Sequence, residues 1–209
     1  TNVTGVEVID GGADQLSGSL GSIAAAAGIN TVSMGDVAAA DDVTILAGFD
    51  NDLTVNLVAD GGVNVVDASA FTKTLSIVGL ASDGETNAPT LTGGTGTSDS
   101  LTIKIDAADD FALTGVSAIE TIKVTDNDST ADFTVSLALA DANAVSTSAT
   151  VSAGTNETIT VDATAIGASG DTLNLDATLE NDSKVVFKGG DGVNGYTMSA
   201  SHSTNLGDT

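Results

Sequence analysis

The chain contains no cysteine, no tryptophan and no arginine, and it has a single proline, Pro89. Without cysteine there can be no disulfide bond, no thiolate zinc site and no cysteine nucleophile. Aromatic residues make up only 3% of the sequence, so a core must be built mainly from valine, isoleucine, leucine and alanine. Such side chains suit thin, repeated layers better than one thick globular centre.

Long apolar runs are also missing, since none approaches the roughly 18 residues that a membrane helix needs. We therefore expect no insertion into a membrane. The sequence begins at Thr1 with neither a methionine nor a basic and apolar leader, and it ends at Thr209 within a strand-and-turn pattern. We interpret it as a piece of a longer exported protein.

Positive charge is scarce. Five lysines stand against 29 acidic residues, which gives a formal net charge of −24. Such a chain repels phosphate backbones and anionic lipids, so nucleic acid is not an expected partner. This charge indicates either disorder or a need for cations, and the apolar alternation along the sequence argues against disorder. Oxygen ligands from Asp, Asn and backbone carbonyls favour Ca²⁺.

Short runs rich in Val, Ile, Thr and Leu recur along the chain between Gly, Asp, Asn and Ser turns, and they alternate with a period of two. This pattern is typical of β-strands. The runs are Val43–Leu46, Leu53–Leu57, Leu101–Ile105, Phe133–Leu137, Thr158–Val161 and Val185–Phe187. One short helix is expected at Ile23–Ala27, ending at Gly28, and Leu137–Val145 is a weaker helix candidate.

The sequence also repeats itself over long distances. Val66–Phe71 reappears 95 positions later as Val161–Ile166, and the glycine pair at Gly93 reappears 96 positions later at Gly189. Ile29–Val32 matches a segment 90 positions later. The matches keep the same order, so we predict two tandem superrepeats, residues 1–97 and 98–209.

A unit of this kind cannot bury its apolar face alone and must stack on its neighbour. The sequence therefore predicts an all-β fold, a parallel β-solenoid with inward Val, Ile and Leu and outward Thr, Asp and Asn. Tandem β-sandwich domains are the alternative, because they also contain short strands at regular spacing.

Two glycine-rich windows are the most specific motifs. Gly189–Tyr196 reads G-G-x-G-x-N-x-Y, and Gly93–Leu101 reads G-G-x-G-x-S-D-x-L. The glycines allow tight turns that direct successive carbonyl groups to one point, and an Asp or Asn further on adds a side-chain oxygen. The predicted metal ligands in these windows are Gly189, Asp191, Asn194, Gly93, Ser98 and Asp99. An ordinary turn is the alternative reading.

These windows resemble the calcium-binding nonapeptide of the repeats-in-toxin family, G-G-x-G-x-D-x-U-x. Asn194 and Ser98 stand where that family has Asp, and Asp99 lies one position further on. The wider pattern, including Gly115–Val124, resembles bacterial surface-layer proteins of the same lineage. The resemblance implies a calcium-bound β-solenoid in a two-dimensional coat on the cell surface.

Acidic clusters outside the glycine windows offer further calcium ligands. A calcium ion takes six to eight oxygens, and each cluster places several within one loop. Solvated acidic turns are the alternative for any single cluster. The clusters named as candidate sites contain Asp50, Asp52, Asp126, Asp128 and Asp182.

Catalytic groups are sparse. His202 is the only histidine, and the sequence has no nucleophile elbow. Paired carboxylates for sugar cleavage are available among the many acidic residues, but sites of this kind on solenoids commonly also use arginine, lysine and aromatic platforms, which are scarce here. We expect no enzymatic activity.

Three functions are compatible with these features. The first is a structural subunit of an extracellular surface layer or filament that assembles with copies of itself and is stabilised by Ca²⁺; cell-surface polysaccharide is a second candidate partner. The alternative is a stalk or spacer in a large calcium-dependent adhesin or biofilm matrix protein. A carbohydrate-binding module is disfavoured, because stacking aromatics are few.

Overall fold

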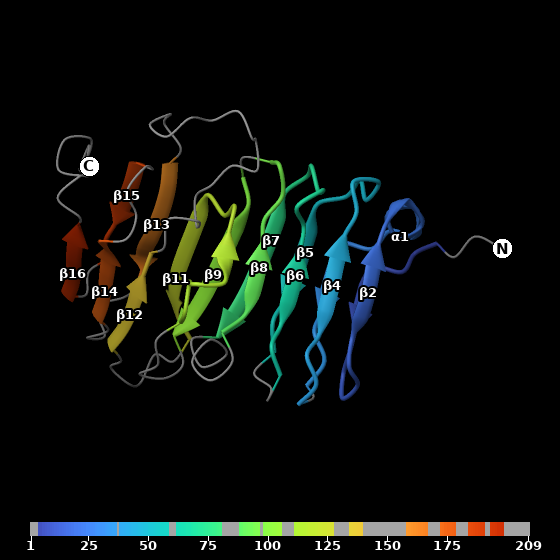
Figure 1. The fold of residues 1–209 in the computed structure, drawn as a ribbon, viewed down its shortest axis with the longest axis horizontal. Helices are drawn as coiled ribbons and strands as arrows, with labels where there is room; N and C mark the ends of the chain where they lie inside the picture. Colours follow the sequence, from blue (N-terminus) through green and yellow to red (C-terminus); the bar gives the residue numbers. More distant parts are fainter. Residues whose placement is uncertain are drawn as a thin grey trace.

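The computed structural model describes residues 4–36, 38–58, 62–80, 88–96, 98–105, 111–127, 134–139, 158–166, 172–178, 184–190 and 193–198. Within these residues the chain winds into a stack of strands that runs from β2, at the blue end of Figure 1, to β16, at the red end. The first and last coils therefore lie at opposite ends of the molecule.

The odd-numbered strands form one continuous wall. The order β1-β3-β5-β7-β9-β11-β13-β15 makes an eight-stranded sheet in which every neighbouring pair is parallel. Its strands are Val8–Asp10, Thr31–Ser33, Leu53–Asn56, Leu75–Leu80, Ser100–Ile105, Thr121–Asp126, Thr158–Ala165 and Lys184–Lys188.

The even-numbered strands form the opposite wall, which is divided in two. A five-stranded sheet has the order β10-β8-β6-β4-β2, and a three-stranded sheet has the order β12-β14-β16. The strands are Ser17–Leu20, Asp42–Ile45, Val65–Asp67, Thr90–Thr92, Val116–Ser117, Thr134–Ala138, Thr172–Ala177 and Val193–Met198. One odd and one even strand make each coil, so the predicted parallel β-solenoid is confirmed and tandem sandwiches are not formed.

Alternation within each strand sorts the side chains between core and solvent. In β7, Leu75 and Ile77 are buried, whereas Ser76 and Val78 are half-buried. Because parallel strands are stacked in register, equivalent inward residues form columns, and the columns join into one apolar core. The scarce aromatic residues anchor the core. Phe49 and Phe71 are fully buried, and the centroids of their rings lie 5.9 Å apart.

The spacing between stacked residues sets the coil length. Partners on the odd-numbered wall lie 21 to 26 positions apart, for example Val8 and Thr31, except that Thr121 and Thr160 lie 39 apart. This longer coil, between β11 and β13, contains β12, which is the first strand of the three-stranded sheet. β9 pairs with both β7 and β11, so the odd-numbered wall continues across residue 98, and the division into two superrepeats stays a prediction.

The long-range sequence matches combine two different structural offsets. The match of Ile29–Val32 at 90 positions joins β3 to β11, which are eight strands apart and share a wall. The match of Val66–Phe71 at 95 positions joins β6 to β13, which are seven strands apart and lie on opposite walls. The two offsets therefore span different numbers of strands. They are similar in residues because the longer coil, between β11 and β13, falls only within the second match.

The one helix among the described elements, α1 (Ser22–Ala27), agrees with the predicted helix. Gly28 ends it in the left-handed region (φ 101°), which glycine adopts without strain. Leu137, the start of the weaker helix candidate, lies instead in β12. No helix among the described residues is long and apolar enough to cross a membrane.

Candidate functional site

The first glycine window forms a corner at which two coils come into close contact. Gly93 is buried after β8, and its N–H donates to Ser117 O of the next coil at 2.9 Å. A Cβ at Gly93 would overlap Ala118 O, and one at Gly94 would lie 2.6 Å from Phe71 O of the preceding coil. The glycines are thus required by the approach of backbone from both neighbouring coils.

The carboxylate of Asp99 lies buried inside this corner. Its Oδ2 accepts the N–H of Gly94 at 2.6 Å, and its Oδ1 accepts the N–H of Leu75, one coil back, at 2.9 Å. Burial raises the pKa of Asp99 above its ordinary value of 3.8, and the two N–H donors oppose part of that rise. These bonds account for the orientation of Asp99 without a cation, and a role in calcium binding stays a prediction.

A second carboxylate adjoins Asp99. Glu120, one coil further on, accepts the N–H of Asp99 through Oε2 at 2.8 Å. Ser98, predicted to be a ligand here, is exposed. The corner therefore holds two acidic groups in successive coils, and Glu120 was not among the predicted site residues. Its position directly before β11, like that of Asp99 before β9, is the signal that could have identified it.

The same arrangement occurs on the other wall around Asp41, which was not among the predicted metal ligands. Asp41 is fully buried directly before β4. Its Oδ1 accepts the N–H of Leu16, one coil back, at 2.6 Å, and its Oδ2 accepts the N–H of Gly35 at 2.5 Å. A Cβ at Gly35 would overlap Asp14 O of the previous coil. Buried corner carboxylates are therefore a recurring element of this fold.

The second glycine window repeats the backbone contact of the first. A Cβ at Gly190 would overlap Ile166 O, as one at Gly94 would approach Phe71 O. Each glycine pair thus lies against a Val-Asp-Ala segment of the preceding coil, whose Asp accepts an N–H two residues on (Asp67 from Ser69, Asp162 from Thr164). Gly189 is exposed, Asp191 is outside the described residues, and the Asn194 side chain is not described.

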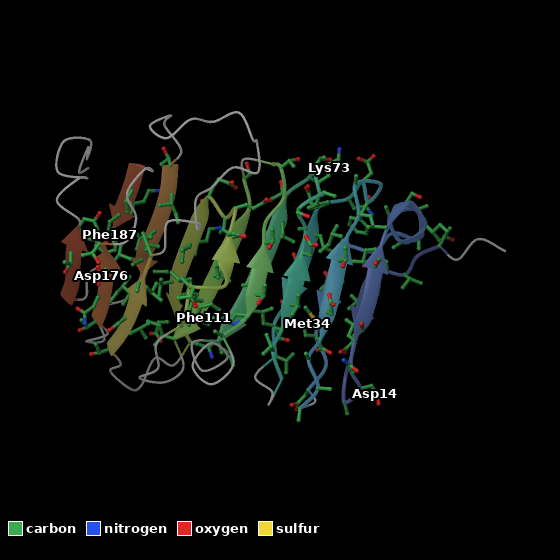
Figure 2. All side chains as sticks on the ribbon, viewed as in Figure 1. Asp14, Met34, Lys73, Phe111, Asp176 and Phe187 are labelled. Atoms are coloured by element: carbon green, nitrogen blue, oxygen red, sulfur yellow. The ribbon has the colours of Figure 1, made fainter. Side chains whose placement is uncertain are left out.

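The predicted acidic cluster at Asp50 and Asp52 has a lysine and a backbone donor beside it. Asp50 Oδ1 lies 2.8 Å from the Nζ of Lys73, which is labelled in Figure 2. Asp52 Oδ1 accepts the N–H of Thr74 at 3.1 Å. The hydrogen bond and charge of Asp50 raise the pKa of Lys73. Asp126 lies half-buried at the end of β11, whereas Asp128 and Asp182 are outside the described residues.

Taken together, the described part of the chain contains no group of three or more His, Cys, Asp or Glu side chains placed to hold a metal ion. Among the described residues, the predicted ligands Gly93 and Asp99 belong to one corner, whereas Asp50 and Asp52 bond to Lys73 and Thr74 at another. No protein-family model matches the sequence, and no curated protein or solved structure matches it either.

Proposed function

We propose that the chain is a non-enzymatic structural segment of an extracellular bacterial surface layer or filament, stabilised by Ca²⁺. The observation that carries the proposal is that acidic side chains greatly outnumber the basic side chains that could neutralise them. The molecule has 29 acidic residues against five lysines and a net charge of −24, and the ion pairs within its described part include Lys73–Asp50 and Lys188–Asp162. Strands stacked about 4.8 Å apart hold these carboxylates close together, which favours cations at the surface.

The shape of the molecule supports a structural role. The continuous parallel wall makes the described strands an elongated stack, in which each coil contacts its neighbours. Polar columns such as Thr31, Thr54 and Ser76 line its outside. Rods of this kind act as spacers or as units of larger assemblies.

Thermal unfolding at constant ionic strength tests the proposed role of calcium. Unfolding is followed by circular dichroism in Ca²⁺, in Mg²⁺ and in excess EGTA, and calorimetric titration counts the bound ions. At a Ca²⁺ concentration 100 times the Kd, each site adds about 2.7 kcal/mol, so the melting temperature should rise in Ca²⁺ more than in Mg²⁺. Coincident melting curves in all three solutions would refute the proposal.

A further inference from the structure

The outward faces of the two walls differ in charge. All five lysines of the sequence lie on odd-numbered strands or, in the case of Lys73, at the corner that leads into β7. Among the described strands, those of the even-numbered wall contain no lysine, and the five-stranded sheet carries Asp42 on β4 and Asp67 on β6. One side of this strongly acidic molecule is therefore partly basic, and the opposite side is purely acidic.

Two lysines form a diagonal pair on the odd-numbered wall, which we call the lysine pair. Register aligns Lys104 with Thr125 and Lys123 with Thr102, so the two lysines lie on adjacent strands and two positions apart. Lys104 is half-buried and Lys123 is exposed, whereas their neighbours along each strand are buried. Neither lysine forms an ion pair with the residues that the structure describes. Both positive groups thus face solvent.

Two aspartates form a pair with the same spacing on the even-numbered wall, which we call the aspartate pair. Register aligns Asp42 with Val65 and Asp67 with Thr44, so these residues also lie on adjacent strands and two positions apart. Asp42 is exposed, and Asp67 is half-buried with its Oδ1 accepting the N–H of Ser69 at 3.0 Å. Each pair spans one coil, about 4.8 Å, and two residues, about 6.6 Å.

The two diagonals run in the same direction in space when one copy lies beside another. The strands of the two walls run in opposite directions, because the chain goes round the core in each coil (Figure 1). From β4 to β6 the aspartate pair advances by two residues along the strand, whereas from β9 to β11 the lysine pair moves back by two. A copy moved sideways, and by three coils or about 14 Å along the stack, would place both lysines opposite both aspartates.

The rest of this contact contains no opposed like charges among the described side chains of the strands. The five-stranded sheet would lie on β7, β9, β11, β13 and β15, and its other outward residues are Ser, Thr and Val. Asp162 and Lys188, which pair with each other at 3.6 Å, would lie opposite Thr92 and Ser117. Small, uncharged side chains at these positions allow the two sheets to approach closely.

We infer that copies of this chain pack side by side, with the lysine pair of one copy on the aspartate pair of the next. The inference rests on the proposed function, whose lateral contact it identifies. A second copy fits because it presents both charges at the same spacing, whereas an anionic polysaccharide would suit only the lysine pair. The two faces lie on opposite sides of each copy, so the contact repeats into a row. Further coils at either end of the stack would extend both walls and leave the contact unchanged.

Sedimentation velocity of the full chain, from micromolar to millimolar concentration at physiological ionic strength, tests this contact. One variant carries Lys104→Glu and Lys123→Glu, and the other carries Asp42→Lys and Asp67→Lys. Each should associate about tenfold more weakly than the wild type, because two attractive pairs become repulsive. An equimolar mixture of the two variants has complementary faces again, and it should recover the association of the wild type.

Control substitutions separate this contact from general charge repulsion. The aspartate variant reduces the net negative charge of −24, so repulsion alone would make it associate more strongly. Asp176→Lys on β14 is the matched control for Asp67→Lys, because Asp176 Oδ1 also accepts the N–H two residues on. Lys73→Glu is the control for Lys104→Glu, since both lysines are half-buried. The controls should associate like the wild type, and melting curves verify that every variant is folded.

Three results would overturn the side-by-side packing: a wild type that stays monomeric at millimolar concentration, reversed variants that associate like the controls, or a mixture that does not recover. Calcium-dependent melting of a chain that stays monomeric would overturn the packing alone. Association through these pairs, with coincident melting curves in Ca²⁺ and EGTA, would overturn the role of calcium and leave the packing standing.

Discussion

Asp41 and Asp99 have the same bonding pattern on opposite walls of the solenoid. Each lies directly before a strand, and each carboxylate bridges a corner glycine and the backbone N–H of a leucine one coil back. Backbone N–H groups that are buried need a partner, and an ionised carboxylate bonds to them more strongly than a neutral group does. These two residues therefore fasten successive coils together at their corners.

Replacing Asp99 by Asn should destabilise the fold by about 1–3 kcal/mol, because the amide NH₂ would face an N–H donor at a buried position. Asp41→Asn should have a similar effect. Urea unfolding gives the difference in free energy, with Asp42→Asn, an exposed neighbour, as the matched control. If Asp99 also binds calcium, the loss will be larger in Ca²⁺ than in EGTA; equal stability of variant and wild type in both would show that the bridge is unimportant.

The dependence of stability on pH should separate two kinds of aspartate. The folded-state pKa of Asp99 is raised by burial, so the folded protein holds this proton more tightly than the unfolded chain does. Acidification through the window just above pH 3.8 should therefore stabilise the wild type relative to Asp99→Asn. Unfolding free energies of the two proteins, measured across that window, check the sign; a constant difference would contradict it.

Asp162 should behave in the opposite way. Its pKa is lowered, chiefly by the hydrogen bond from the Thr164 hydroxyl, and the charge of Lys188 also contributes. The stability that it adds is present above pH 3.8 and is lost as the pH falls through its lower folded-state pKa. Asp162→Asn should thus cost most near neutral pH, and Thr164→Ala should reduce the size of this pH effect.

Glycine-to-alanine substitutions should distinguish positions where only glycine fits from positions that have room for a side chain. Gly93→Ala should destabilise the protein by about 2 kcal/mol or more, because a methyl group would overlap backbone of the next coil. Gly18→Ala meets open space, and it should be neutral or stabilising by about 0.4–1 kcal/mol. Thermal unfolding of the two variants provides the comparison. Similar melting temperatures would disprove the close packing assigned to Gly93.

Asn64 provides a test of buried amide chemistry. It is 2% exposed, its Nδ2 donates to Val58 O at 3.1 Å, and its Oδ1 has no hydrogen-bond partner. Asn64→Asp replaces the donor by an oxygen facing a carbonyl, and it should destabilise the fold by about 1–3 kcal/mol at neutral pH. The loss should shrink at low pH, where the protonated acid can donate. A pH-independent loss would exclude this explanation.

Much of the fold could be predicted from local sequence. Period-two alternation identified strands such as Leu101–Ile105 and assigned their inward faces, because side-chain direction in a strand depends only on parity. The glycine windows were also recognised as special positions, and Gly93 does lie against backbone of the next coil. The parallel stack followed from small apolar residues combined with repetition.

The contacts between coils could not be predicted in the same way. Nothing in the period-two pattern states that Gly94 lies against Phe71, since that contact depends on the length of the intervening coil. For the same reason, the sequence did not show that the 90-residue match joins strands of one wall and the 95-residue match joins strands of opposite walls. The burial of Asp99 was missed because an acidic residue beside a glycine turn is equally compatible with solvent, a cation or backbone donors.

The continuous ladder of the odd-numbered wall determines how the molecule would respond to a pulling force. Tension between the first and last coils acts along the hydrogen bonds and across the strands, so coils would peel off singly while the others stay intact. A coil of 21 to 26 residues, which is the length of all the described coils except the one between β11 and β13, would exchange a step of about 4.8 Å for roughly 80 Å of extended chain. A rod built in this way would lengthen stepwise under load and absorb mechanical energy before it broke.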